Sequence, residues 1–428
     1  MDLFKEIEKL KRENVIDAET AERISKYYES KEDNQPSRLV LLFGVLGAIL
    51  SGLGLLLIVA HNWDMLSKWT KTSIAFAILA SAHLLGIYVL LKKNEYLSWK
   101  ESASSFLSLA LASTISLIAQ IYHISGPFDE FLLYLSLMCF PLVYLFSSNA
   151  TTLLYLFAIT LYMLENNFGR LDPSQKVMIY LMLVALVIPH YIRACNKNQT
   201  YLLSSLHWAF PFSLLLCPAV LGHHYGDFTF ISYFSMLSIF IGIAGLDYFE
   251  NRKPFTNGYL LLGVSGTILL LWILSFDGFW STLKHDLAHW SKGLSSPEFL
   301  LSLLLNAIAL ILMIVQYQKK NLSIWWPLQG TFILFNIIFW IGLYGQMAVL
   351  LMNALALFLG IVIIRTGIQK KDLTILNVGL ILLSGLAICR FFDSDLSYIV
   401  RGLLFLCIGI GFFLINYRML KHKSKDEK

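Results

Sequence analysis

Charge is scarce in this sequence. Asp, Glu, Lys and Arg make up 14% of the 428 residues, whereas hydrophobic residues make up 57%. A water-soluble domain carries about 25% charged residues, so the scarcity of charge excludes a water-soluble fold for most of the chain. Because a lipid bilayer offers the backbone no hydrogen-bond partners, only helices and closed barrels can span it.

The cysteines are few and show no paired spacing. Four of the five, Cys139, Cys217, Cys389 and Cys407, fall in apolar runs, and Cys195 lies in a short polar loop. No two of them are spaced as CxxC, so the sequence indicates neither a disulfide framework nor a cysteine zinc site. We interpret them as small packing residues, and the sequence assigns no cofactor.

The long apolar runs predict an all-α fold. They are about 20 residues long and do not alternate with a period of two, which favours transmembrane helices over barrel strands. We therefore predict a polytopic transmembrane helical bundle over residues 39–417. About fourteen runs have the length of a span, at 39–60, 72–91, 103–122, 130–147, 150–165, 175–193, 201–221, 228–248, 257–276, 297–317, 324–344, 346–365, 374–391 and 398–417.

Two polar segments flank this bundle. Residues 1–38 show two short helical patterns separated by a break between Asn14 and Asp17, with Asp17 as the N-cap of the second helix. On that helix, Ala21 and Ile24 share one face with Tyr28. We predict a short cytosolic helical hairpin that contacts a cytosolic partner or a second copy of the chain. Its acidic residues offset its basic ones, which argues against nucleic acid, and residues 418–428 form a basic cytosolic tail.

The distribution of basic residues predicts the orientation. Cytoplasmic loops of membrane proteins carry an excess of Lys and Arg. With the N-terminus in the cytosol, only eight of the 33 Lys and Arg residues fall outside, and the other 25 fall inside. The eight are Lys68, Lys71, Arg170, Lys176, Lys284, Lys292, Arg390 and Arg401. The alternation supports the number of spans and a cytosolic location of both termini.

The predicted spans have no Asp, Glu, Lys or Arg near their middle, and His83 is the main ionisable residue at depth. Proton pumps, cation antiporters and voltage sensors need charged groups at depth, so this absence argues against those classes. The amides Asn306, Asn336, Asn353 and Asn377 lie inside spans. They would either line a polar path or hydrogen-bond across helices as structural contacts.

Histidine and carboxylate residues gather in the predicted outer loops, where six of the ten histidines lie. Such residues can bind a divalent metal or act as acid and base, although water-facing loops are polar for solubility alone. One pattern, His285-Asp-Leu-Ala-His289, resembles the HExxH zinc helix with Asp286 in place of the glutamate. An interfacial amphipathic helix with tryptophans at the headgroups explains the same stretch without a metal.

Three motifs point to a family. They are His61-Asn62-Trp63-Asp64 at the end of a glycine-rich helix, Ala119-Gln120-Ile121-Tyr122-His123, and Arg390-Phe391-Phe392-Asp393 followed by Arg401. Together with the N-terminal helical pair, they resemble the bacterial membrane-protein family called domain of unknown function 2157. The resemblance implies a bacterial cytoplasmic (inner) membrane protein and no particular reaction.

All three motifs fall at the outer ends of predicted helices, which makes them a candidate polar site. We expect their side chains to converge, either as a binding site or as a polar clasp that locks the bundle. A partner from another helix is expected for Arg390 or Asp393, with Asp64 and Arg401 as the nearest candidates. The candidate residues are Asn62, Trp63, Asp64, Gln120, Tyr122, His123, Arg390, Asp393 and Arg401.

Three functions fit these observations. The first is a carrier or flippase for a neutral or lipid-like molecule, which suits the number of helices and the uncharged interior. The second is a membrane-embedded enzyme of the outer leaflet that uses His123, Asp64 and Asp393. The third is a membrane scaffold or sensor that works through the N-terminal hairpin. The sequence favours a role without catalysis, in contact with the lipid bilayer.

The orientation can be tested by cysteine labelling in a cysteine-free background. We expect K71C to react with a membrane-impermeant maleimide from outside the cell, and K371C to react only after permeabilisation. Labelling of K71C from the cytosolic side alone would contradict the predicted orientation.

Overall fold

The computed structural model describes residues 63–165, 171–197, 202–222, 225–250, 254–283, 292–318, 324–344 and 347–391, together with 17–24 and single positions near both ends. The chain divides into two compact units, Met1–Ile74 and Ala75–Lys428. The described residues form helices and connections, without a strand.

The first unit contains the predicted N-cap. A helix begins directly after Asp17, and the backbone N–H of Ala21 donates to the Asp17 carbonyl. Hydrogen bonds from Thr20 to the Asp17 carboxylate lower the pKa of that group, as expected for a carboxylate at a helix N-terminus. Ala21 is buried and Ile24 is half-buried, which agrees with the predicted helix face. The first predicted helix lies largely outside the described residues.

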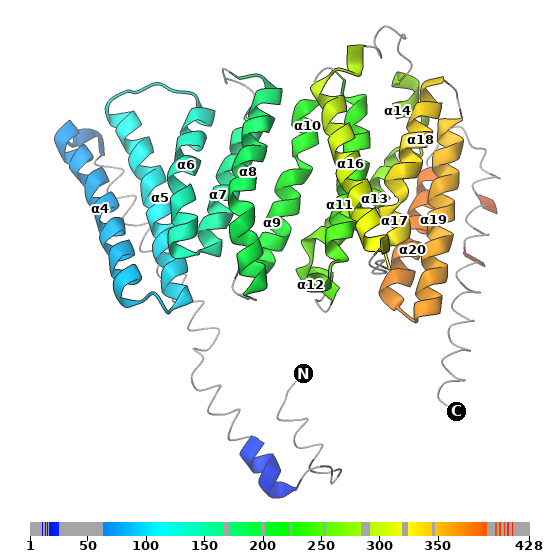
Figure 1. Cartoon of the computed structure of the whole chain (residues 1–428), viewed down its shortest axis with the longest axis horizontal. Helices are drawn as coiled ribbons and strands as arrows, with labels where there is room; N and C mark the ends of the chain where they lie inside the picture. The colour runs from blue at the N-terminus through cyan, green and yellow to red at the C-terminus, as the bar shows by residue number, and fades with distance from the viewer. Residues whose placement is uncertain are drawn as a thin grey trace. The chain divides into compact units, whose positions relative to one another are not determined.

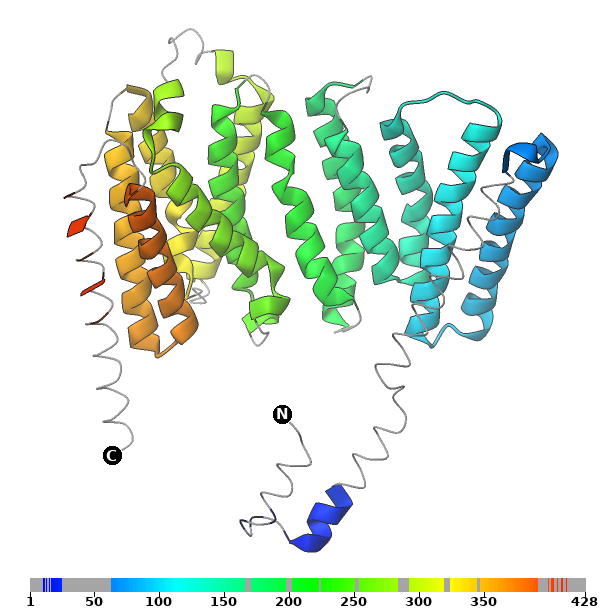
Figure 2. The ribbon, with the colours of Figure 1, turned by 180° about the vertical axis from the view of Figure 1, so that it is seen from behind.

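The second unit is a row of helices that run alternately in opposite directions (Figures 1 and 2). Helix α4 begins in the first unit, and its larger part lies in the second. In chain order the helices are α4 (Lys68–Lys92), α5 (Leu97–Ile121), α6 (Phe128–Phe146), α7 (Asn149–Leu164), α8 (Pro173–Asn196), α9 (Leu203–Leu215), α10 (Cys217–Leu221), α11 (Asp227–Ala244), α12 (Asp247–Glu250), α13 (Gly258–Ile273), α14 (Asp277–Thr282), α16 (Pro297–Gln318), α17 (Trp326–Gln329), α18 (Thr331–Tyr344), α19 (Ala348–Lys370) and α20 (Leu373–Phe391).

Ten of these helical segments are long and apolar enough to cross a membrane, counting α9 with α10 and α17 with α18 as single segments. Two shorter apolar helices, α7 and α13, occupy the positions of two further predicted spans. The all-α prediction is therefore confirmed for the described residues. The first predicted span, 39–60, lies outside them, as does 398–417 apart from single helical positions.

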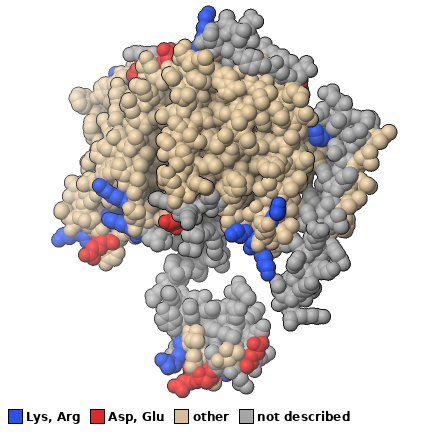
Figure 3. All heavy atoms as spheres, turned by 45° about the vertical axis from the view of Figure 1, so that its right-hand side comes forward, with Lys and Arg blue, Asp and Glu red and all other residues tan. Residues whose placement is uncertain are grey.

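Basic residues gather on one face of the second unit, where several of its helices end. The connections after α4, α8 and α19 lie on one face of the unit, and they carry the basic residues Lys92, Lys93, Lys197, Lys370 and Lys371. Between the charged edges, Figure 3 shows a broad belt of the surface without visible Lys, Arg, Asp or Glu. Such a belt fits contact with the hydrocarbon core of a bilayer.

The two largest hydrophobic clusters of the described residues meet at α11. One joins α6 to α10 with parts of α11 and α13, and the other joins α11 and α13 to the helices from α14 to α20. In the most apolar window of α11, 67% of the residues are buried, against 17% for α16. Helix α11 is therefore the central helix of the unit, whereas α16 packs along it and keeps a wide outer face.

Two of the short helices have a proline at their start. Pro218 lies in the first turn of α10 and Pro327 in the first turn of α17, where a missing N–H costs nothing because that group has no partner within the helix. Pro141, Pro189 and Pro211 lie inside continuous helices.

Helix α7 has 16 residues and is about 24 Å long, shorter than a hydrocarbon core of about 30 Å. Its N-terminus is buried and receives a carboxylate from α5. The carboxylate of Glu101 accepts hydrogen bonds from the Asn149 N–H at 2.9 Å, the Ala150 N–H at 2.7 Å and the Ser148 hydroxyl. A negative charge at this end is favourable, because the first N–H groups of a helix lack partners and carry partial positive charge.

This contact predicts that Glu101 contributes more to stability than Glu95, a carboxylate nearby in the sequence. Replacing Glu101 by alanine should lower the free energy of unfolding by about 2 kcal/mol, because it leaves buried N–H groups without acceptors. Replacing Glu95, which is exposed, should change it by less than about 0.5 kcal/mol. Unfolding in mixed detergent micelles measures both. Equal effects of E101A and E95A would contradict the capping role.

Candidate functional site

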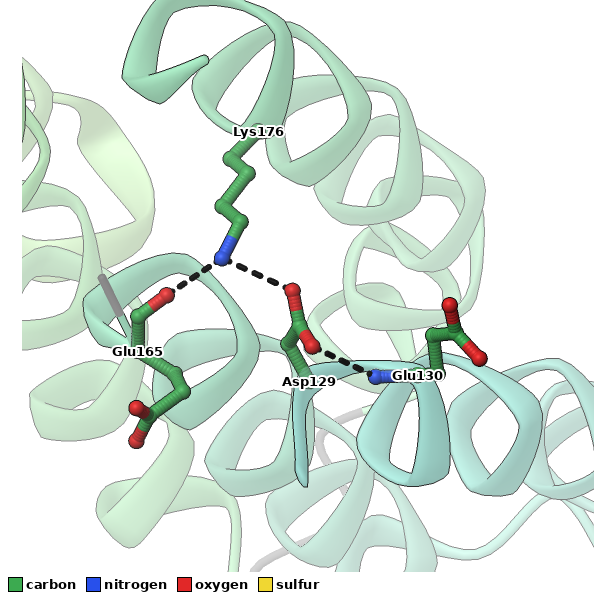
Figure 4. A network of polar contacts seen from close by, with 4 residues as sticks. All are labelled: Asp129, Glu130, Glu165 and Lys176. Atoms are coloured by element: carbon green, nitrogen blue, oxygen red, sulfur yellow. Dashed lines mark hydrogen bonds and ion pairs between the residues drawn. The ribbon is translucent and has the colours of Figure 1, made fainter. Parts of the chain in front are cut away.

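A buried ion pair lies at the other end of α7. The Lys176 ammonium, in the first turn of α8, lies 2.8 Å from a carboxylate oxygen of Asp129, in the first turn of α6. The two side chains are 1% and 5% exposed. Lys176 also donates to the backbone carbonyl of Glu165, directly after α7, and Asp129 accepts from the Glu130 N–H at 3.0 Å (Figure 4).

These contacts make Lys176 the C-terminal counterpart of Glu101. The last carbonyl groups of a helix lack partners and carry partial negative charge, so a cation there is stabilising. Glu101 from α5 and Lys176 from α8 therefore hold the two ends of α7 with charges of matching sign. Asp129 neutralises the lysine, and a buried charge needs such a partner.

The hydroxyl of Tyr162, near the same end of α7, has no hydrogen-bond partner among the described residues. Tyr162 is 1% exposed and packs against Leu132 and Ile179. These residues lie three positions after Asp129 and Lys176, and therefore on the same helix faces. The arrangement is tightly packed. It suits a structural contact that holds α6, α7 and α8 together better than a catalytic centre.

A second polar centre joins the C-terminal helices. The carbonyl of Ser275, between α13 and α14, accepts from Arg390 of α20 at 2.8 Å and from the Asn353 amide of α19 at 3.0 Å. The Arg390 guanidinium also lies 4.8 Å from the centre of the Phe276 ring. Arg390 was expected to find a partner on another helix. In the structure it donates to Ser275, which lies in the connection between α13 and α14.

A third polar group runs through the membrane-spanning part of the row. On α16, Ser302, Asn306 and Gln316 lie on one stripe, since their spacing brings them to one side of the helix. The Asn306 carbonyl oxygen accepts from the Asn336 amide at 2.8 Å, Gln316 accepts from the Gln329 amide at 2.9 Å, and the Gln316 amide donates to the Gly242 carbonyl at 2.8 Å. Uncharged side chains thus connect α16 with α11, α17 and α18.

Helix α11 adds two serines to this group. Ser235 and Ser238 lie seven and four residues before Gly242 and therefore share its face, which is turned toward Leu312 and Gln329. Both serines are at most 1% exposed. The Ser238 hydroxyl and the Gln329 carbonyl oxygen have no hydrogen-bond partner in the described part of the chain. We call Ser235, Ser238, Asn306, Gln316, Gln329 and Asn336 the amide column.

The residues of the second motif have a local backbone role. Tyr122 and His123 are exposed, as is Gln120, at the C-terminal end of α5. His123 has a φ of 52°. Its N–H donates to Gln120, and the Ile124 N–H donates to Ala119. This pattern is a Schellman cap, a position where glycine is usual.

The structure does not bring the second and third motifs together. Helix α5, with Gln120, Tyr122 and His123, and helix α20, with Arg390, lie near opposite ends of the row in both views (Figures 1 and 2). Convergence of these two motifs was therefore a wrong expectation, because equal depth in a membrane says nothing about lateral distance.

The remaining predicted positions are described only in part or not at all. Trp63 is half-buried in the 3-10 helix Trp63–Met65, with the Lys71 ammonium 5.5 Å from its ring centre. The side chain of Asp64 lies outside the described residues, as do Asn62, Asp393, Arg401, His285 and His289. In the described part of the chain, no three His, Cys, Asp or Glu residues lie close enough to hold a metal ion.

Two buried histidines, His190 and His207, escaped the sequence reasoning. His83, which the sequence placed at depth, is exposed, and its Nδ1 donates to the Leu79 carbonyl. His207 is fully buried instead, with Nδ1 2.7 Å from the Tyr191 hydroxyl and Nε2 3.3 Å from the Tyr248 hydroxyl. His190 is buried beside Asn149. Their partners lie 16 to 41 residues away in sequence, so no local pattern could reveal them.

Comparison with known families supports the motifs. Residues 8–152 match the family "Predicted membrane protein (DUF2157)". The resemblance is thereby confirmed for the N-terminal part, which contains the first two motifs. No curated protein and no solved structure matches the chain. The family description names a membrane protein and no activity, so the chain is a multi-pass membrane protein whose role must come from its own geometry.

The ion pair yields a prediction for three variants. K176M should lower the free energy of unfolding by about 3–5 kcal/mol, because it leaves the Asp129 carboxylate buried without a counter-charge. The double variant D129L/K176M should recover most of that loss, since it removes both charges. Unfolding in mixed micelles measures each variant, with E130Q as the control for a neighbouring carboxylate. A double variant as unstable as K176M would contradict the role of the ion pair.

Proposed function

We propose that the protein is a membrane carrier or flippase for a neutral or lipid-like molecule. The observation that supports this proposal best is the amide column. It connects the most buried span, α11, with α16 and with the α17–α18 segment, and it contains hydrogen-bonding groups without charge. A carrier of an uncharged molecule needs such groups inside the membrane, whereas a charged substrate would require buried ions at high cost.

The unused hydrogen-bonding capacity of the column supports the same proposal. Buried polar atoms in folded proteins nearly always have a partner, but the Ser238 hydroxyl and the Gln329 carbonyl oxygen have none in the described residues. A hydroxyl or amide group of a passing molecule would supply one. Membrane transporters commonly bind their substrates where helices are interrupted, and the α17–α18 break at Gly330 lies next to Gln329.

The arrangement of the cores supports a path beside α11. The two hydrophobic clusters pack on different sides of this helix, so a rearrangement of one cluster against the other would open the contact between α11 and α16. Gly242 is at that contact, where a Cβ atom would lie 2.5 Å from Leu312 and 2.9 Å from Gln329. The close approach depends on the absence of a side chain at this position.

We further propose the location and orientation of the carrier. The family resemblance and the basic residues after α4, α8 and α19 support a bacterial cytoplasmic membrane with both termini in the cytosol. The face with Arg390 and Ser275 is then the outer one, and Arg390 belongs to its polar rim. The N-terminal hairpin is proposed to contact a cytosolic partner or a second copy.

A flipping assay tests this proposal. The full chain is reconstituted into liposomes with a trace of fluorescent monoglucosyl diacylglycerol or of the matching phosphatidylglycerol, and dithionite quenches the label in the outer leaflet. We expect protein-containing vesicles to exchange the uncharged glycolipid at least about tenfold faster than empty ones, and N306L/N336L to lose most of that rate. Removal of two hydrogen-bonding groups corresponds to roughly tenfold or more.

A matched control keeps the result specific. The T366V variant removes a hydroxyl from α19 that bonds only within its own helix, and it should flip lipid like the unchanged protein. No acceleration by folded protein for either lipid would contradict the proposed function. Faster exchange of phosphatidylglycerol alone would contradict the assignment of an uncharged substrate.

A further inference from the structure

The amide pair Asn306–Asn336 reaches the outer surface of the row. Both residues are half-buried, whereas Ser302 and Gln316 on the same stripe are buried. Asn306 is near the middle of α16, and Asn336 is near the middle of the α17–α18 segment. A polar group partly exposed at this depth faces hydrocarbon instead of water, which is costly unless a polar partner meets it.

Apolar side chains surround this pair on the surface. Leu303 and Leu310 lie three residues before and four after Asn306, and they are 59% and 44% exposed. Ile333 and Trp340 have the same spacing around Asn336 and are 36% and 37% exposed. This spacing places each flanking residue on the same helix face as its asparagine. The amides are therefore a polar patch inside a lipid-facing surface.

The pair keeps one donor and one acceptor for a ligand. The Asn336 amide nitrogen donates to Asn306 and to the Phe332 carbonyl, and the Asn306 amide nitrogen donates to the Ser302 carbonyl. In the described part of the chain, the Asn336 carbonyl oxygen accepts no hydrogen bond, and the second N–H of Asn306 donates none. Adjacent donor and acceptor groups match a hydroxyl group, which both donates and accepts.

We infer that the Asn306–Asn336 pair binds the uncharged, hydroxyl-bearing headgroup of a lipid as it passes the middle of the membrane between α16 and α18, while the acyl chains stay in the bilayer. This inference rests on the proposed function, because it names the substrate class and its route to the amide column. The described parts of α16, α17 and α18 contain no Lys or Arg, so a phosphate headgroup would find no counter-charge there.

The occupant follows from the same observations. A second copy of the chain would bring its own leucine and isoleucine face, which gains nothing from an amide partner unless the two pairs align on a symmetry axis. A lipid brings its apolar chains to Leu303, Leu310, Ile333 and Trp340 and its hydroxyl groups to the amides. It satisfies both parts of the patch at once.

Photocrosslinking of the full chain in liposomes tests the inference. The probes are a diazirine-bearing monoglucosyl diacylglycerol and the matching phosphatidylglycerol, with the labelled peptides identified by mass spectrometry. We expect the glycolipid to label the peptides of α16 and α18, unlabelled glycolipid to compete, and N336L to reduce this labelling about fivefold. The phosphatidylglycerol probe should label these peptides no more than any other lipid-facing helix.

Two tryptophan variants keep the test independent of folding defects. L310W fills the surface beside Asn306 and leaves both amides in place, so it should reduce labelling at the patch. I361W adds the same side chain to the exposed face of α19, where Ile361 is 54% exposed, and should have no effect. Equal labelling by both probes, or labelling unchanged in both N336L and L310W, would overturn the inference.

The same vesicles separate this inference from the proposed function. Glycolipid exchange without competable labelling at α16 and α18 would leave the carrier function standing and refute the lateral site. Competable labelling without any exchange would refute the carrier function, and with it the assignment of the patch to a transport route. Formation of a disulfide-linked dimer on oxidation of N306C, in a cysteine-free background and in the same vesicles, would replace the lipid by a second chain.

Discussion

The low polarity of hydrocarbon is the constraint on which this structure depends, and helix α7 shows it most directly. An α-helix leaves N–H groups free at one end and carbonyl groups at the other. Spans that cross the bilayer present these groups to the headgroup region, whereas a helix of about 24 Å ends short of it. Glu101 and Lys176 supply the missing partners from neighbouring helices. Two of the buried charges of the unit thus follow from the length of one helix.

The same constraint explains the smaller polar side chains. Serine and threonine hydroxyls along the spans mostly donate to carbonyls of their own helix, as Ser108 does to Ser104 and Thr366 to Val362. The side-chain amides also donate to carbonyls of their own helix, as Asn336 does to Phe332, but they bond to other helices as well, as Asn336 does to Asn306 and Gln316 to Gly242. The hydroxyl groups therefore mostly find hydrogen-bond partners within their own helix, whereas the amides also connect α16 with α11, α17 and α18.

The sequence predicted the helices well and their neighbours poorly. The length of an apolar run follows from the thickness of the bilayer, and basic residues mark the loops between runs. The spans from α4 to α20 could therefore be predicted directly from the sequence. Lateral neighbours depend on packing, which no local pattern records. Lys176 was predicted to lie on the outer side, but its pairing with Asp129 across 47 positions was not predictable. His123 and Arg390 were expected together, although α5 and α20 lie far apart. The short fifth span was visible in the sequence, but its two charged caps were not.

The charged caps of α7 also set an order for its biosynthesis. A segment of 16 residues partitions weakly into a bilayer by its own hydrophobicity, since a stable span needs about 20 residues. Glu101 leaves the ribosome before α7, but Lys176 leaves after it. Helix α7 therefore lacks its C-terminal cap until α8 emerges. Lys176 then completes a group of four helices, α5 to α8, whose charged caps are all in place only when the four lie together.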